Sequence, residues 1–187
     1  LPHSIILCVL CALADLVTGV TVVCLVVEET LLGRRILDAL SVVHWPLPGT
    51  VVAINLIVAF SKGTPFSFGQ VLIGSFWLLP IAYFIRHLPI IFRASSAVLE
   101  QLDDSLEEAA RNLGAGAFYA FRRVTLPLIG PGVLAGTLLA FVIALGEFVA
   151  SILLYVYSNR PIAIEILSQL RQFNIGSAAA YGVLLLI

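Results

Sequence analysis

Long apolar runs alternate with short polar segments along this chain. A helix rises about 1.5 Å per residue, so about 20 apolar residues are needed to cross the hydrocarbon core of a bilayer. Asp15 is the charged residue inside the first run. The runs predict five membrane-spanning helices, at residues 4–27, 39–60, 71–85 (extendable back to Phe66), 128–155, and from 175 to the end of the sequence.

These runs predict helices rather than barrel strands. A backbone inside lipid must pair its polar groups internally, which limits spanning structures to helices and closed barrels. Barrel strands are about 10 residues long and alternate apolar with polar positions. The runs here are longer and show no such alternation. The expected fold class is therefore an all-α membrane protein.

Composition supports the same class. Hydrophobic residues make up 60% of the chain, charged residues make up 11%, and the mean hydropathy is +1.09. An average soluble domain has about 25% charged residues. The formal charge of −1 and the scattered distribution of the ten Lys and Arg residues leave no basic patch for nucleic acid.

Three cysteines, Cys8, Cys11 and Cys24, lie in the first apolar run. We interpret them as small buried residues, because a zinc site would need a fourth ligand. The first run is too long to be a signal peptide, and it lacks the basic flank and the cleavage site of one. The sequence contains no Met and stops within an apolar run. We therefore expect a fragment of a longer chain.

The polar segment from Asp103 to Pro127 predicts a short helix. Ser105 as N-cap and Glu108 three residues later match a capping box, and Gly114 can end the helix in a left-handed conformation. One face of this helix carries the apolar residues Leu106, Ala109, Ala110, Leu113 and Ala117. A helix this short is marginal alone, so it needs either another protein or its own bundle to pack against.

The same segment carries a spaced motif. Glu108-Ala109-Ala110 is followed by Gly114 after three residues, and nine further residues lead to Val124-Thr125-Leu126-Pro127. This pattern resembles the cytoplasmic signature of ATP-binding-cassette (ABC) importer permeases, with Val124 where the family has Ile. In those permeases the loop docks on the ATPase subunit. The resemblance implies an ATPase-coupling loop within a cytoplasmic segment, residues 86–127, formed by Glu107, Glu108, Ala109, Ala110, Arg111, Gly114, Val124, Leu126 and Pro127.

Three further stretches resemble permeases of the ferric-iron, thiamine and polyamine importer group. They are Pro48-Gly49-Thr50-Val51, Leu145-Gly146-Glu147-Phe148 and Asn159-Arg160-Pro161-Ile162. The resemblance implies one type I permease domain over residues 1–187, with a five-helix core whose last helix is truncated. It also implies multi-pass insertion in a prokaryotic inner or plasma membrane, with ferric iron as the solute.

The resemblance also implies partners. Two ABC ATPase subunits, a periplasmic or extracellular solute-binding protein, and a second permease domain, identical or fused, would complete such an importer. ATP hydrolysis would then belong to the partner subunits, and this chain would carry neither catalytic residues, a cofactor nor a metal site.

The loop charges give an orientation. With the Glu108 loop in the cytoplasm, successive crossings place residues 28–38 inside as well, and residues 61–70 and 158–174 outside. The inside set holds seven basic residues: Arg34, Arg35, Arg86, Arg93, Arg111, Arg122 and Arg123. The outside set holds three: Lys62, Arg160 and Arg171. This excess agrees with the positive-inside rule.

Polar residues inside predicted spans are candidates for a solute pathway. An acidic group at the centre of a bilayer costs about 2.5–3.5 kcal/mol on insertion scales, so it usually faces protein or water. Glu147 is expected in the outer half of its span, either lining the pathway or pairing with a neighbouring helix. Asp15 could line the pathway or form a packing contact with Thr18 and Thr21, and Asn55 could line it or bond between helices.

Enzyme motifs are missing from the sequence. The single lysine, Lys62, does not follow a phosphate-binding glycine loop, and none of the three His residues is followed by Glu, as a metalloprotease motif requires. No Gly-x-Ser-x-Gly elbow occurs. The main alternative is a secondary transporter or a channel subunit without an ATPase partner. That alternative explains the spans and the buried acids but not the spaced motif.

Overall fold

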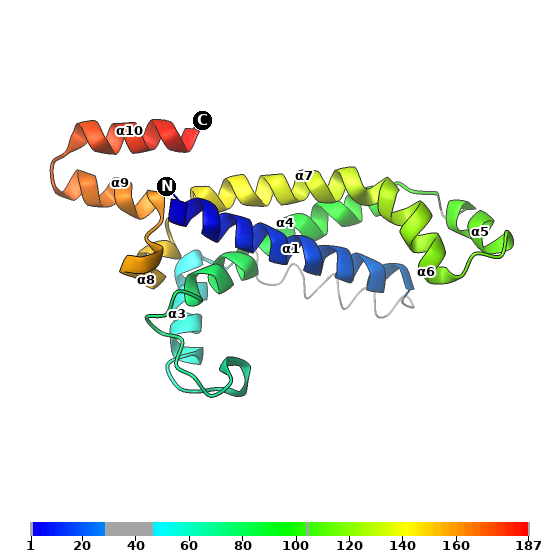
Figure 1. Ribbon diagram of the computed structural model, residues 1–187, viewed down its shortest axis with the longest axis horizontal. Coiled ribbons are helices and arrows are strands. Elements are labelled where there is room, and N and C mark those ends of the chain that lie inside the picture. Colours follow the sequence, from blue (N-terminus) through cyan, green and yellow to red (C-terminus); the bar gives the residue numbers. More distant parts are fainter. Residues whose placement is uncertain (1, 29–46, 104, 187) are drawn as a thin grey trace. The chain divides into compact units, whose positions relative to one another are not determined.

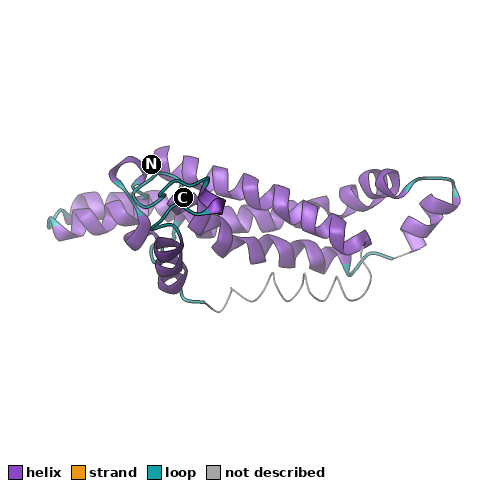
Figure 2. Cartoon of the chain, turned by 90° about the horizontal axis from the view of Figure 1, so that it is seen from below, coloured by secondary structure: helices purple, strands orange, loops and turns teal. Residues whose placement is uncertain are grey.

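Helices form all the regular structure in the described part of the chain. The computed structural model describes residues 2–28, 47–103 and 105–186 (Figure 1). No strand occurs within these ranges (Figure 2). The prediction of an all-α fold is therefore confirmed. The fold has a physical reason, because apolar segments in a membrane must pair their backbone groups internally.

The helices differ widely in length. The α-helices are α1 (Pro2–Glu28), α3 (Gly49–Ala59), α4 (Leu78–Leu99), α5 (Ser105–Asn112), α6 (Ala117–Ala120), α7 (Leu126–Leu145), α8 (Ser151–Leu154), α9 (Ile162–Arg171) and α10 (Ile175–Leu186). Short 3₁₀ turns form η1 (Pro65–Ser67) and η3 (Tyr157–Asn159), and a π-helical turn forms η2 (Phe121–Thr125).

The first and last predicted spans correspond to α1 and α10. For the second span, residues 39–46 and the adjoining predicted loop 29–38 lie outside the described residues. α3 begins only at Gly49, after Pro48, so residues 47–48 do not belong to one long helix with it. With 11 residues, α3 is about 16 Å long, about half of the hydrocarbon thickness.

The third predicted span was wrong in its position. Residues 71–77 form turns, and α4 runs instead from Leu78 to Leu99. Gly69 and Gly74 both have positive φ, 77° and 75°, so the apolar run before Leu78 bends rather than continuing as a helix. Hydropathy alone did not reveal this, because the turn residues lie among large apolar ones.

The fourth predicted span was too long at its end. α7 stops at Leu145, and the chain turns at Gly146 and Glu147 before the single-turn helix α8. The segment expected to be an outer loop, residues 158–174, also contains the helix α9. Within the described residues, two helical stretches are long and apolar enough to cross a membrane: Pro2–Thr21 and Phe118–Leu145.

The described residues fold into two compact units, and α1, α4 and α7 contribute residues to both. Unit 1 comprises Leu1–Ala12, Trp45–His87 and Phe141–Ile187. Its core packs the start of α1 with α3, the first turns of α4 and the end of α7. Cys8 and Cys11 are buried there, as predicted, and the Cys24 side chain lies outside the description.

Unit 2 comprises Leu13–His44 and Leu88–Ala140. Ile129 and Val133 of α7 are the buried centre of its apolar cluster. Gly132 and Gly136 let α7 approach α4 closely: a Cβ at Gly136 would lie 2.7 Å from Ala94 Cβ. Small residues at such contacts are typical of helices packed within membranes.

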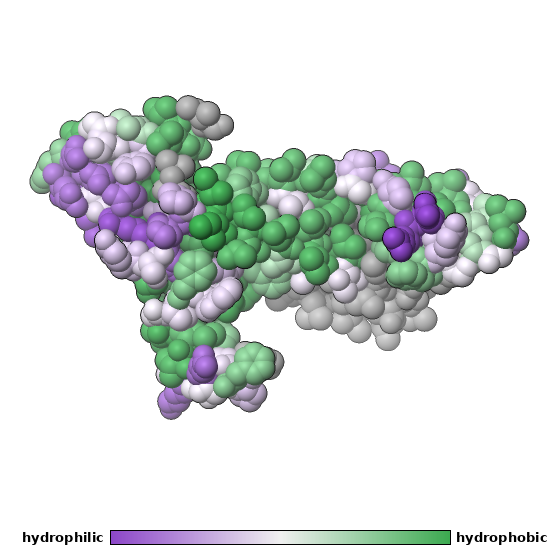
Figure 3. Space-filling view, viewed as in Figure 1, coloured by the Kyte–Doolittle hydropathy of each residue, from purple (hydrophilic) through white to green (hydrophobic). Residues whose placement is uncertain are grey.

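Large apolar side chains remain exposed along α1 and α7, where they cover much of the visible face (Figure 3). Val17 on α1 and Leu134, Leu138 and Val142 on α7 are among them. In water such a surface would be unfavourable, since apolar area costs about 25 cal/mol per Å². In a bilayer it faces lipid, as membrane insertion requires.

Candidate functional site

Two regions carry most of the residues that the sequence singled out, and each lies within one unit. The first is the coupling segment, residues 100–127, in unit 2. The second is a network of polar side chains around Glu147 in unit 1. We describe them separately.

The predicted short helix of the coupling segment is α5, Ser105–Asn112. Ser105 is its first residue rather than the cap before it, and the Glu108 side chain of the predicted capping box lies outside the described part. Asp103 takes part instead, because its Oδ1 accepts the Ser105 N–H at 2.9 Å and its carbonyl accepts the Leu106 N–H at 3.0 Å. The bond from the Ser105 amide lowers the pKa of the Asp103 carboxyl below its usual value.

Gly114 ends this helix as predicted. It has φ of +88°, a conformation that favours glycine. The Leu113 N–H donates to Ala109 O at 3.2 Å and the Ala115 N–H donates to Ala110 O at 3.1 Å, so two of the last helical carbonyls are satisfied. The glycine of the motif therefore has a structural reason.

The apolar face of α5 is turned away from its own unit. Leu106 and Leu113 are 45% and 90% exposed, and Ala109 is exposed as well. An open pocket of 480 Å³ lies beside this face, and it is lined by Ala110, Leu113, Gly114, Ala115, Gly116 and Tyr119. The side chains of Glu107, Glu108 and Arg111 lie outside the described part. The face is thus open to a further apolar surface.

The end of the motif leads into the membrane helix. Leu126 N–H donates to Phe121 O, five residues back, which makes η2 a π-helical turn. Pro127 follows as the second residue of α7 and has no N–H to donate, so the wider turn accommodates it. Val124 is half-buried, and Leu126 packs against the Ile129–Val133 cluster.

Glu147 is the centre of the second region. It is 6% exposed, and its Oε2 lies 3.2 Å from Arg86 Nε on α4. Its Oε1 accepts the Ala150 N–H at 3.0 Å, which stabilises the turn between α7 and α8. Both carboxylate oxygens therefore have partners within the chain. Of the two predicted possibilities, the structure contains the pairing with a neighbouring helix, and the pathway role stays a prediction.

The backbone of Glu147 is held as well. Its carbonyl accepts hydrogen bonds from Tyr83 Oη at 3.2 Å and from Ser151 Oγ. Tyr83 Oη and Ser151 Oγ are 2.6 Å apart. Tyr83 and Ser151 are both buried. These two hydroxyl groups thus hold the backbone at the point where α7 ends.

Arg86 also lies directly against the first residue of α3. A Cβ on Gly49 would overlap Arg86 Nη1 and would come within 2.8 Å of Arg86 Cζ. Glycine at the centre of the Pro48-Gly49-Thr50 stretch leaves room for this guanidinium, which a larger residue would have to displace. One arginine contacts α3 and the α7–α8 turn from its place on α4.

The sequence contained one signal for this pair that the prediction did not use. Arg86 stands in an apolar run, and a charged residue in such a run usually pairs with an opposite charge. The predicted orientation counted Arg86 as cytoplasmic but placed Glu147 in the outer half of its span. Those two placements cannot both hold for residues in contact. Either Arg86 leaves the cytoplasmic count or Glu147 leaves the outer half of its span, and the orientation itself stays a prediction.

Asp15 and Asn55 have different environments. Asp15 is buried in unit 2, and neither carboxylate oxygen has a hydrogen-bond partner among the described residues. The Thr18 and Thr21 hydroxyls, which were predicted as its partners, donate instead to backbone carbonyls of α1. Asn55 is exposed on α3 and makes no side-chain hydrogen bond within the described ranges, so the expected bond between helices is not seen there.

Comparison with known proteins identifies the family. The model of the family described as binding-protein-dependent transport system inner membrane component matches residues 30–187. This chain belongs to that family. The predicted resemblance to ABC importer permeases is thereby confirmed, as are the all-α type I permease core and the assignment to the inner membrane.

The relatives agree with this assignment. The chain is 39% identical over 132 residues to a probable ABC transporter permease protein, y4fN, of Sinorhizobium fredii, covering 71% of this chain and 23% of that protein. It is 36% identical over 151 residues to the molybdenum transport system permease protein ModB of Escherichia coli, covering 76% and 65%. It is 32% identical over 164 residues to the sulfate transport system permease protein CysT of Salmonella typhimurium, covering 82% and 58%. The chain thus spans less than two thirds of the length of these relatives.

Proposed function

We propose that this chain is part of the membrane-spanning subunit of an ATP-driven importer and forms one half of its solute pathway. The observation that carries the proposal is the coupling segment. An exposed apolar face on α5, ended by Gly114 at positive φ, lies within the motif that the sequence shares with ABC permeases. Membership of the family supports the same function.

The coupling segment would bind the ATPase subunit. Leu113 and Tyr119 border an open pocket large enough to receive apolar side chains of a partner. Glu107 and Glu108 would add negative charge beside that contact and would pair with basic residues of the ATPase. Leu126 fixes the other end of the segment on the unit 2 cluster, so a push on α5 would be transmitted to α7.

The transport step would follow from rigid-body motion. Two ATPases closing on ATP would move the coupling segments of two permease domains, and their helices would rock between outward-open and inward-open states. ATP hydrolysis belongs to the ATPase in this scheme, and this chain supplies the path. A solute-binding protein would deliver the solute on the outer side.

The solute is best described by class. Relatives are named for the transport of molybdenum, sulfate and Fe(3+). Their common property is a small inorganic ion, and we propose that class here. Ferric iron, suggested by the sequence resemblance, is one member of it.

A pathway role for Glu147, Asp15 and Asn55 remains part of the proposal. Glu147 already has an internal cation partner in Arg86, so it would shape the path more than attract a free cation. Glu147→Gln keeps the volume and removes the charge. Loss of uptake in proteoliposomes at unchanged protein abundance would support a role in transport, whereas normal uptake would argue against any electrostatic role.

The test of the whole proposal is association with the ATPase. The full-length permease is co-expressed with candidate ATPase and binding-protein subunits, and solute-stimulated ATP hydrolysis is measured after purification. Gly114→Val should abolish co-purification, because a β-branched residue resists positive φ. The matched control is Gly74→Val, which imposes the same strain at φ of 75° in a different loop. A permease that transports its solute with no ATPase bound would favour the secondary transporter or channel instead.

A further inference from the structure

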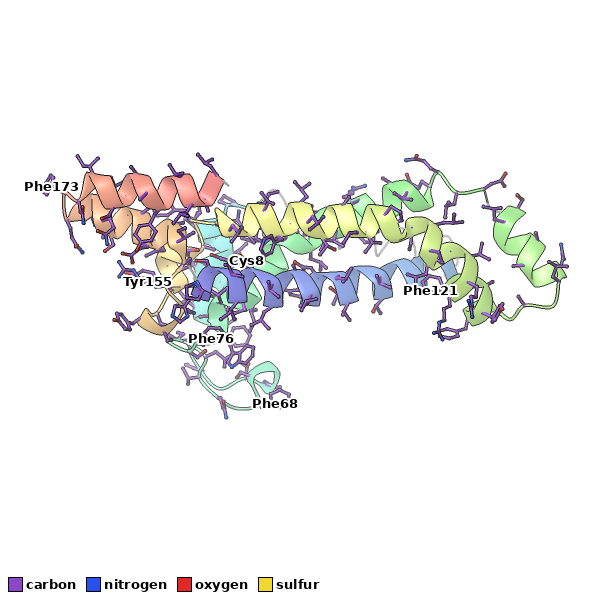
Figure 4. All side chains as sticks on the ribbon, turned by 45° about the horizontal axis from the view of Figure 1, so that its top comes forward. Cys8, Phe68, Phe76, Phe121, Tyr155 and Phe173 are labelled. Carbon is purple, nitrogen blue, oxygen red and sulfur yellow. The ribbon has the colours of Figure 1, made fainter. Side chains whose placement is uncertain are left out.

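The segment between α3 and α4 is apolar but not helical. Residues 61–77, which we call the aromatic loop, contain only the short turn η1, and their single charged residue is Lys62. Phe68 is 95% exposed, and Val71, Ile73 and Trp77 are exposed beside it. Figure 4 shows Phe68 within the loop and Phe76 near its end.

The aromatic loop has a defined conformation. The Thr64 N–H donates to Ser67 Oγ at 3.0 Å, and the Gly69 N–H donates to Thr64 O at 3.0 Å. Gly63 lies so close to Gly69 that a Cβ would come within 2.7 Å of the Gly69 carbonyl carbon. These contacts hold Phe68 at φ of 52° with its side chain outward.

The other end of the loop is attached to the core of unit 1. The Asn159 side-chain amide donates to Phe76 O at 3.0 Å, and Asn159 is buried. The rings of Phe76 and Trp77 meet edge to face, with centroids 5.7 Å apart. The exposed side chains of the loop are therefore presented by a fixed scaffold.

Such a loop does not suit either bulk phase. In the hydrocarbon core its unpaired backbone N–H and C=O groups would each cost several kcal/mol. In water its apolar side chains would cost about 25 cal/mol for each Å² exposed. The headgroup region of a bilayer accepts both, because it offers hydrogen bonds to the backbone and an apolar boundary to the rings. Aromatic residues concentrate there for this reason.

We propose that the aromatic loop is inserted in the headgroup region of the membrane, with phospholipid as its partner. The charge agrees, because Lys62 has no Asp or Glu beside it in residues 61–77 and a basic residue is attracted to anionic lipid. Insertion is independent of the proposed function. The leaflet is a separate matter: the predicted orientation, which rests on the proposed function, would place the loop in the outer one. A loop held in lipid is not available to a solute-binding protein, which must then dock elsewhere.

A second exposed aromatic residue provides a matched comparison. Phe173, in the turn between α9 and α10, is 88% exposed and has φ of 57° (Figure 4). Its neighbours are polar: Gln172 precedes it, and Asn174 follows and donates to Gln169 Oε1 at 3.1 Å. Exposure and backbone conformation are thus alike at Phe68 and Phe173, and the surroundings differ.

Tryptophan fluorescence tests the proposal in full-length permease reconstituted in vesicles of phosphatidylcholine and phosphatidylglycerol. Trp45→Phe isolates Trp77, with any further tryptophans of the longer chain also replaced. Phe68→Trp and Phe173→Trp are each made in a tryptophan-free background. Lipids brominated near the headgroup report contact with the interface, lipids brominated near the chain end report deep burial, and iodide reports contact with water.

Trp77 and Phe68→Trp are expected to emit at shorter wavelength than Phe173→Trp and to be quenched at least twofold more strongly by the shallow brominated lipids. Phe173→Trp is expected to be quenched mainly by iodide. The proposal is overturned if iodide quenches Trp77 and Phe68→Trp as strongly as Phe173→Trp. It is equally overturned if no quencher reaches them, since another protein domain would then cover the loop. None of these outcomes depends on ATPase association, so the proposed function is judged separately.

Discussion

The coupling segment and the Glu147 network use apolar and polar groups in opposite ways. In the coupling segment, Leu106 of the short helix α5 and Leu113 just after it are exposed, and α5 packs against α6 and η2 of the same segment. Around Glu147, a buried carboxylate pairs with a partly exposed guanidinium, and a buried phenol and hydroxyl bond to each other and to the Glu147 carbonyl. The first arrangement leaves an apolar face open, and the second gives both carboxylate oxygens of Glu147 a partner within one unit.

This difference indicates how the two regions respond to substitution. A change in the coupling segment should affect association and transport while leaving the fold intact, because few internal contacts are lost. A change in the Glu147 network should affect stability first, because an ion pair and buried hydrogen bonds would be lost. The predictions below test this separation, beginning with the largest expected effect.

Glu108→Lys should abolish transport. The change reverses a charge in the first turns of α5, where a negative charge suits the helix dipole and the proposed basic partner. Membrane insertion should be unchanged, measured as the amount of protein in the membrane fraction. The control is Gln101→Lys, which introduces a lysine outside the motif and changes the charge by +1 rather than +2. Unchanged uptake in vesicles carrying Glu108→Lys would remove the docking role of this residue.

Arg86→Met should destabilise the protein by about 2–3 kcal/mol. Removing one partner of a fully buried pair costs about 3–5 kcal/mol, and Arg86 keeps 26% of its side chain exposed, so screening reduces the effect. Stability is measured by heating in detergent with a thiol-reactive dye that reports exposure of the buried Cys8 and Cys11. The double variant Arg86→Met/Glu147→Gln should lose less than the sum of the two single variants. Strict additivity would show that the pair contributes no coupling.

Gly49→Ala should destabilise by about 1–2 kcal/mol, as expected for overpacking. The new methyl group would displace the Arg86 guanidinium from its position against Glu147. Gly176→Ala is the matched control, because its Cβ would meet no atom within 4 Å and alanine favours helices by about 1 kcal/mol. The same heating assay applies. Equal stability of Gly49→Ala and the native protein would mean that Arg86 moves without cost.

Acid pH should loosen the first turn of α5, with the smallest effect of the four. The pKa of Asp103 is lowered by its bond to the Ser105 amide, so the folded state favours the ionised carboxyl. This contribution is present above the ordinary Asp value of about 3.9 and is lost as the pH falls through the lower folded value. Hydrogen exchange at the Ser105 amide, corrected for its intrinsic pH dependence, should accelerate as the pH falls through this folded-state pKa. Asp103→Ala should exchange fast at every pH.

Sequence reasoning succeeded where the information was local. The bounds of α1, the short helix α5 and the stop at Gly114 all follow from hydropathy, periodicity or glycine chemistry within a few residues. The family assignment likewise came from one spaced motif in the coupling segment. Each of these features is decided by neighbours along the chain.

Sequence reasoning failed where the structure depends on distant contacts. The end of α7 at Leu145 is set by Arg86 and Tyr83, which are more than 60 residues away along the chain. The turns at residues 71–77 lie in a run as apolar as the helix that follows, so hydropathy could not separate them. The sequence could indicate that the partner of Glu147 is a basic residue in a span. It could not indicate which helix carries that residue.

The contact between Gly49 and Arg86 has a consequence for how this protein can vary. A larger residue at position 49 would displace the end of the Arg86 side chain, and a shorter residue at 86 would leave the acid at 147 without this cation. Positions 49, 86 and 147 should therefore change together, in natural sequences and in designed libraries, and single substitutions at any of them should be depleted. Substitutions in these three separate stretches of the chain are therefore expected to depend on one another. Two of the stretches resembled the family although no local feature explained the resemblance.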